Sequence, residues 1–329
     1  MKIKRTASAL LAVCSAGLLT AGIVTYAIDN QASLKDASLE NSFIRLTVDQ
    51  HSEQSEYLQF RLATTGGKTG NQADDNKNIT YRNFCSGYTT ISINGENYVY
   101  GRGVDTSQPE YNAEKKCHTS SQKFGDVEIR QELTFAEGYT PGYEDMLNIS
   151  YTVLNAGEND SIGVRVLIDP AIADDDTLRL SADNVSISKE AVFSEKLPSD
   201  WKAEMSNDSS VSAYGKLSGS ALMPSSITFA DWYNIYDSLW DYSPDINYAI
   251  SDASVAVKWE PVKNPVNTVF STKYGIRNTA NTGTDNNAQI SSPKTSTKTV
   301  VRTAVFMLIA VVSAFGSYYF SRKEKNNAQ

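Results

Sequence analysis

The sequence is poor in the residues that most enzymes use for catalysis. Only two histidines occur among its 329 residues, His51 and His118, and they lie far apart in the chain. No glycine-rich phosphate loop, HExxH pair or CxxC pair is present, so phosphate-loop, zinc-hydrolase and thiol-redox chemistry have no visible basis. His118 lies in a charged, loop-like stretch, where we expect a solvated side chain. The sequence therefore indicates no catalytic residue.

Cysteines and basic patches are also scarce. Of the three cysteines, Cys14 lies in an N-terminal apolar run, which leaves Cys85 and Cys117. In an exported chain this pair is compatible with one disulfide, worth ~3–4 kcal/mol if the geometry allows it, and two buried free thiols are the alternative. The formal net charge is −8. Without a basic patch, this charge argues against nucleic acid and anionic lipid as partners.

The N-terminus has the features of an export signal. Lys2, Lys4 and Arg5 form a positive cluster, and no charged residue follows from Ala7 to Ala27. This pattern is typical of a secretory signal peptide, residues 1–27, which is cleaved after the small residue Ala27. An uncleaved membrane anchor is the alternative. A lipoprotein signal at Cys14 fits less well, because a valine precedes it where a small residue is expected.

The C-terminus contains a second apolar segment. No charged side chain occurs from Thr303 to Phe320, and at about 1.5 Å per residue this stretch reaches roughly 27 Å, just enough to cross a bilayer core. We expect a transmembrane helix over residues 300–320 and a cytoplasmic basic tail over 321–329, because positive residues hold that end inside the cell. The preceding chain would then be exported. A buried core helix is the alternative, but it would not need the basic tail.

The pentapeptide SPKTS lies shortly before this predicted helix. Together with the apolar helix and the basic tail, it resembles the sorting signals of Gram-positive surface proteins. In that family a sortase cuts after the threonine and joins its carbonyl to a cell-wall amine. The resemblance implies Thr295 as the acyl donor and Pro293 as the residue that keeps the peptide extended. Ser292 and Ser296 stand where leucine and glycine are usual. The implied partners are sortase and the cell-wall peptide; a single-pass membrane protein is the alternative.

Residues 28–276 form the predicted extracellular domain: after a polar lead-in at 28–41, the chain shows the period-two alternation of β-branched and aromatic side chains that predicts strands. Asn94-Gly95 predicts a tight hairpin turn between two of these strands, and only 229–242 has helical spacing. Residues 277–299 are rich in Asn, Thr and Ser and predict a flexible stalk. We therefore expect an all-β fold, a large antiparallel β-sandwich with one short helix. The predicted strands are 43–48, 57–63, 88–93, 97–101, 127–135, 146–155, 161–169, 191–193, 211–217, 253–259 and 267–274.

The same region is similar to an uncharacterised domain of exported bacterial surface proteins. The phrases that carry the resemblance are ATTGGKTGNQADDNKNITY, SGYTTISINGENYVYG, IGVRVLIDP, ITFADW and AVKWEPV. The resemblance covers roughly residues 41–276 and implies the supersandwich architecture of galactose mutarotase-like folds. It implies a fold and a location, and it brings no established catalytic residues.

Two groups of residues are candidates for binding. Asp174, Asp175 and Asp176 are clustered oxygen ligands that could hold Ca²⁺ outside the cell, as could the loop at residues 74–76; acidic loops that are simply solvated are the alternative. No other cofactor is expected. Trp232, Tyr236 and Trp240 could stack on the apolar faces of sugars, but aromatic residues at helical spacing more often belong to the core, which is the favoured interpretation.

The expected function is therefore a surface-displayed binding or structural module, anchored to the cell wall or the membrane. Its ligand would be a carbohydrate or another surface component. The alternative, a carbohydrate-active enzyme on a mutarotase-like scaffold, rests on fold analogy alone. Carboxylates or a histidine converging in a concave pocket would favour the enzyme, and a flat or aromatic-lined face would favour binding.

Overall fold

The computed structural model describes residues 37–49, 58–65, 75–81, 85–112, 115–173, 175–208, 210–217 and 222–277. The predicted signal peptide with Ala27, the sorting motif with Pro293 and Thr295, the membrane helix and the basic tail lie outside these ranges, as does nearly all of the predicted stalk. Within them, no helix is long and apolar enough to cross a membrane.

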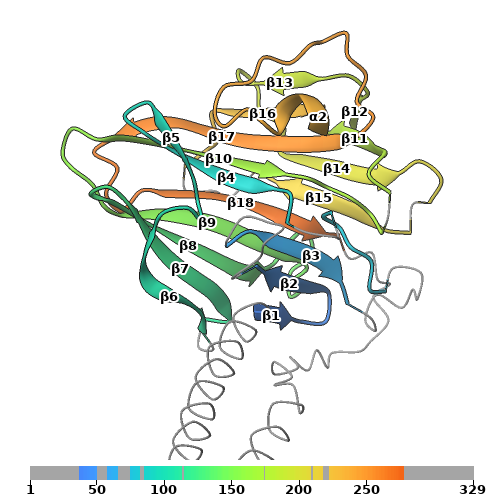
Figure 1. Ribbon diagram of the computed structural model, residues 1–329. Coiled ribbons are helices and arrows are strands. Elements are labelled where there is room, and N and C mark those ends of the chain that lie inside the picture. The colour runs from blue at the N-terminus through green and yellow to red at the C-terminus, as the bar shows by residue number, and fades with distance from the viewer. Residues whose placement is uncertain are drawn as a thin grey trace, which may run out of the picture. The chain divides into compact units, whose positions relative to one another are not determined.

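Two large antiparallel sheets dominate the fold (Figure 1). The six-stranded sheet has the order β13-β16-β17-β10-β4-β5. Its strands are β4 (Tyr88–Ile93), β5 (Glu96–Val99), β10 (Ser161–Ile168), β13 (Ala191–Phe193), β16 (Ser226–Asp231) and β17 (Ala253–Lys263). Asn94 and Gly95 both have positive φ, 54° and 90°, between β4 and β5. The predicted hairpin turn is thus confirmed, because a type I′ turn needs positive φ at both positions.

The nine-stranded sheet has the order β12-β11-β14-β15-β18-β9-β8-β7-β6. Its strands are β6 (Val104–Asn112), β7 (Cys117–Phe124), β8 (Val127–Ala136), β9 (Met146–Asn155), β11 (Leu178–Ala182), β12 (Val185–Ile187), β14 (Asp200–Met205), β15 (Ser212–Lys216) and β18 (Val269–Ile276). A small third sheet, β1-β2-β3, consists of β1 (Ala37–Glu40), β2 (Ile44–Val48) and β3 (Phe60–Thr64).

One continuous core joins the sheets. Alternate apolar side chains of β10 and β17 belong to the same buried cluster as those of β9 and β18, which is the arrangement of a sandwich whose inner faces interdigitate. Ile162, Val164, Val166 and Ile168 share one face of β10 and are all buried, as the alternation predicts. The fold is mostly antiparallel β-sheet with very little helix, and the all-β prediction is confirmed at that level.

Three expectations need correction. The helical pattern at 229–242 is mostly not helix: its first residues belong to β16, which pairs with β17, and only α2 (Trp232–Ile235) is helical. Cys85 and Cys117 are separate buried thiols, so of the two alternatives the free thiols hold and the disulfide does not. His118 is fully buried in β7, not solvated, and burial lowers its pKa to about 4.

Candidate binding surface

The outward face of β10 is covered by the chain between β16 and β17. We call residues 232–252, which comprise α2 and the segment leading to β17, the aromatic loop. Its Ile235 is buried against Leu167 of β10 and Ala256 of β17, with Trp232 and Tyr242 beside them. Trp240 lies against Gly163, where a Cβ atom would come within 2.6 Å of the indole ring. This cover explains why β10 is buried on both faces.

Glu190 is the first of three buried charged residues that hold the loop in place. It is only 2% exposed. Its Oε1 accepts hydrogen bonds from the Asp231 amide (3.1 Å) and the Asn234 side chain (2.9 Å). Its Oε2 accepts from the Tyr242 hydroxyl (2.6 Å) and the Asp245 amide (2.8 Å). One carboxylate therefore links both ends of α2 to the middle of the loop.

Asp231 is the second anchor, and it is also buried. Its Oδ1 caps α2 by accepting from the Tyr233 amide at 3.3 Å. Its Oδ2 accepts from the Ser251 amide and hydroxyl, at 2.9 and 2.8 Å, and from the Asp252 amide at 3.1 Å. Burial alone would raise the pKa of Asp231, but these hydrogen bonds outweigh it and the pKa is lowered. The first and last turns of the loop are thus tied to one ionised group.

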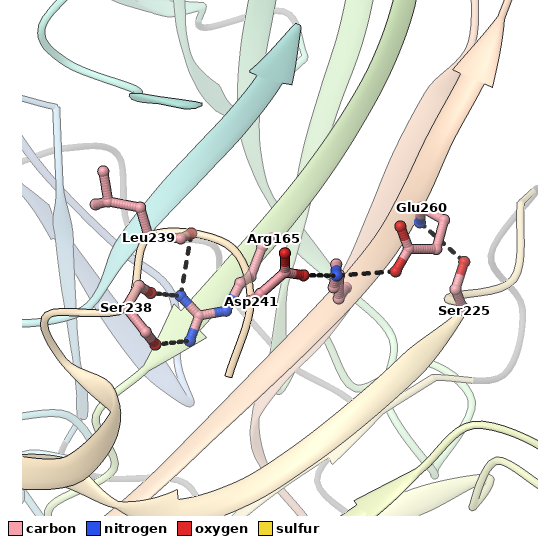
Figure 2. Close-up of polar contacts among 7 residues, drawn as sticks. Arg165, Ser225, Ser238, Leu239, Asp241 and Glu260 are labelled. Carbon is pink, nitrogen blue, oxygen red and sulfur yellow. Dashed lines mark hydrogen bonds and ion pairs between the residues drawn. The ribbon is translucent and has the colours of Figure 1, made fainter. Parts of the chain in front are cut away.

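Arg165, the third anchor, projects outward from the middle of β10 and is 2% exposed. Its guanidinium donates to the carbonyls of Ser238 and Leu239, the latter at 3.2 Å, and to the Ser238 hydroxyl at 3.3 Å (Figure 2). The neighbouring Tyr88 hydroxyl donates to the Tyr236 carbonyl at 2.6 Å. Burial lowers the Arg165 pKa. The sequence analysis did not single out Arg165; the signal that could have found it is an arginine among the β-branched residues of IGVRVLI.

The anchored loop leaves large apolar side chains in solvent. It contributes five of the ten that are exposed among the described residues: Tyr233, Tyr236, Leu239, Ile246 and Tyr248, of which Tyr233 is 73% exposed. The rings of Trp232 and Tyr236 are stacked, with centroids 5.9 Å apart and planes at 25°. Exposed apolar side chains gathered in one place mark interaction sites.

The three predicted stacking residues have different surroundings. Trp232 and Tyr236 form the stacked pair, with Tyr236 41% exposed. Trp240 is apart from them: it contacts Gly163, and the Lys258 ammonium lies 4.7 Å from its ring centroid. Lys258 is itself paired with Asp241 at 2.9 Å and Glu260 at 2.8 Å. Only the first two rings therefore form an available surface.

A second candidate site surrounds the Asp169 carboxyl group, at the end of β10. Its Oδ2 accepts from the Ser86 hydroxyl at 2.5 Å, and its Oδ1 has no hydrogen-bond partner among the described residues. Burial raises the Asp169 pKa to about 7. Nearby Asp252 also has its pKa raised to about 7, by burial and then by repulsion from Asp176 and Asp231. The adjoining pocket, which includes Gln59, Arg61 and Tyr81 in its lining, has room for about one water molecule.

Only part of the predicted calcium site at 174–176 belongs to the described residues. Asp174 lies outside the described residues, and Oδ1 of Asp175 accepts a local bond from the Thr177 amide at 2.9 Å. Over the described ranges, no group of three or more His, Cys, Asp or Glu side chains is arranged to hold a metal ion. Calcium binding therefore stays a prediction.

Comparisons with known proteins add little to this geometry. No protein-family model matches the chain, and no curated protein is similar to it in sequence. Two solved structures of heparan sulfate lyase HepC from Pedobacter heparinus, the second a mutant, align over 74% of the chain with 10% and 9% identity and TM-scores of 0.40 and 0.38. The alignment covers 36% of each lyase chain, and at these scores the likeness carries no argument about function.

Proposed function

We propose that this protein is a binding module that takes carbohydrate on the aromatic loop, by stacking sugar rings on Trp232 and Tyr236. The observation that carries the proposal is the anchoring of the loop. Glu190, Asp231 and Arg165 are buried charged residues, and their side chains hydrogen-bond to the loop or to its flanks. This network holds in place a segment on which Tyr233, Tyr236 and Tyr248 are exposed, while Trp232 is half-buried.

A pre-ordered surface of this kind suits a binding role. A loop that is already fixed loses little conformational freedom when a ligand arrives, so more of the contact energy appears as affinity. Aromatic rings present a large rigid apolar face with only two side-chain torsions to immobilise. The stacked pair of Trp232 and Tyr236 therefore gives an apolar sugar face a firm partner.

A carbohydrate-active enzyme is the second candidate, favoured by one observation, the buried Asp169 carboxyl with its pKa raised to about 7. A carboxyl that titrates near neutrality is a common feature of acid–base catalysis. Among the described residues, however, the adjoining space is of water size and not of the size of a sugar ring. The binding role is therefore the better supported of the two.

The proposed setting of the module is the outer surface of the cell. The support is the sequence: a predicted signal peptide at 1–27 precedes the β-domain, and a sorting-like motif, an apolar segment predicted to be helical and basic residues follow it. Export places the aromatic loop among extracellular glycans. The anchor would be the cell wall through Thr295 or the membrane through residues 300–320.

A glycan array with the full-length protein in detergent, followed by affinity measurements on the best glycan, tests the binding role. Trp232→Ala and Tyr236→Ala should each weaken binding by about ten-fold, the effect of losing one stacked ring. Tyr236→Phe keeps the ring and is the matched control, with affinity near that of wild type. Binding that survives both alanine variants unchanged, or an array with no glycan bound, would contradict the proposal.

A further inference from the structure

Every charged residue of the aromatic loop is acidic. Asp237, Asp241, Asp245 and Asp252 lie within residues 232–252, and no lysine or arginine does. The first three are exposed, and the Asp241 side chain is 87% exposed. The segment that carries the ring pair therefore contributes only negative charges of its own.

Three basic residues contact the loop, and none of them is paired with Asp237 in the described part of the chain. Arg165 is buried beneath the loop with its guanidinium on backbone carbonyls. Lys258 is held between Asp241 and Glu260. Lys189 is exposed and reaches the loop through a backbone bridge to Ala249. Asp237, the neighbour of Tyr236, is thus the carboxylate closest in sequence to the ring pair, and its charge disfavours anionic ligands there.

The loop contains the same ring-and-carboxylate pair twice. In Trp240-Asp241, the ring and the carboxylate together hold the Lys258 ammonium, 4.7 Å from the ring centroid and 2.9 Å from the carboxylate oxygen. This is a cation–π contact closed by an ion pair. Tyr236-Asp237 repeats the pair four positions earlier. Within the described residues no basic side chain is paired with Asp237, and both side chains are exposed.

We propose that Tyr236 and Asp237 bind the ammonium group of an amino sugar, and that the aromatic loop selects glycans with free amines, of the glucosamine type, over N-acetylated and acidic ones. This inference rests on the proposed carbohydrate-binding function and names its ligand class. Lys258 fills the first pair, and an amine of the ligand takes the corresponding place at the second pair, where the Asp237 carboxylate is hydrogen-bonded to the Tyr236 hydroxyl. Trp232 then supports the apolar face of the sugar beside it.

The test compares three oligosaccharides of equal length at pH 6: a glucosamine oligomer, its N-acetylated counterpart and a sulfated glycan. The full-length protein should bind the glucosamine oligomer about five-fold tighter than the N-acetylated one, and the sulfated one weakest. Raising the salt concentration should reduce this preference, because it rests on exposed charges. Asp237→Asn should bring the preference close to one. The matched control is Asp208→Asn, an exposed aspartate whose Oδ1 accepts from the Ser210 amide at 2.8 Å, and it should leave the preference unchanged.

The remaining outcomes separate this inference from the function on which it rests. If the N-acetylated oligomer binds as tightly as the amine form while Trp232→Ala still weakens binding by about ten-fold, the amine selection is wrong and the carbohydrate-binding role stands. If no oligomer binds, both are wrong. An oligolysine peptide that binds as tightly as the glucosamine oligomer, and loses affinity in Asp237→Asn, would show that the site takes basic peptides and would overturn the amino-sugar assignment.

Discussion

Replacing Glu190 by glutamine removes one acceptor from the centre of the anchored loop. The new amide group donates and cannot accept. Either oxygen can be the one replaced, and in both cases one partner can adjust: the Asn234 side chain can flip and the Tyr242 hydroxyl can rotate. A backbone amide, that of Asp231 or Asp245, then loses its acceptor. A buried unsatisfied group costs about 1–3 kcal/mol and the other bonds lose their charge assistance, so we expect Glu190→Gln to lower the free energy of unfolding by about 3 kcal/mol.

Urea unfolding and limited proteolysis measure this effect together. Chymotrypsin should cleave the aromatic loop of Glu190→Gln faster than that of the wild type, because Tyr233, Tyr236 and Tyr248 are already exposed and the loop is less firmly held. Glu195→Gln, at an exposed position five residues later, is the matched control. A Glu190→Gln protein within about 0.5 kcal/mol of wild type, with unchanged cleavage, would refute the claim that this carboxylate anchors the loop.

Two further predictions concern a buried carboxyl and the anchoring motif. Burial raises the Asp169 pKa from 3.8 to about 7, so between these pH values the folded state binds more protons than the unfolded state. The free energy of unfolding therefore falls as the pH rises from about 4 to 7, by at most on the order of 4 kcal/mol. Asp169→Asn should remove this loss in urea titrations at successive pH values, and equal pH dependence in the two proteins would contradict the assignment. Thr295→Ala should leave export intact and shift the protein from the wall fraction to the membrane fraction; a wild-type protein extracted at full length by detergent alone would contradict sorting.

The sequence predicts a strand where one face of that strand is apolar. In SIGVRVLI every second residue is β-branched, and those residues are the buried inner face of β10. β7 could not be found this way. Its sequence, CHTSSQKF, is mostly polar, yet most of its side chains are buried. Hydrogen bonds replace apolar contact there: Tyr100, for example, donates its hydroxyl to the Ser120 carbonyl at 3.0 Å.

The aromatic run misled the helix prediction for a physical reason. Ring spacing of three and four residues indicates one face of a helix, but ITFAD pairs with β17 along its length, and tertiary pairing overrides local spacing. The position of each ring is decided by side chains distant in sequence. Arg165 is 73 residues from Ser238, and Glu190 is 41 residues from Asp231. No local pattern around Trp232 or Tyr236 contains that information, so the core and stacking interpretations could not be separated.

The three buried charged anchors fix the conformation of the aromatic loop more than they stabilise the fold. Removing a charged group from water costs several kcal/mol, and well-packed apolar side chains at the same places are often equally stabilising. Glu190 and Arg165 are each 2% exposed, and their hydrogen bonds compensate that cost only with the backbone of the loop in one conformation. Apolar substitutes would cover β10 as well, but they would tolerate several arrangements of the chain above it. What the charged anchors add is a single arrangement, in which Trp232 and Tyr236 remain stacked at the surface. That is the property which a ligand-binding surface requires and which the stability of the sandwich does not.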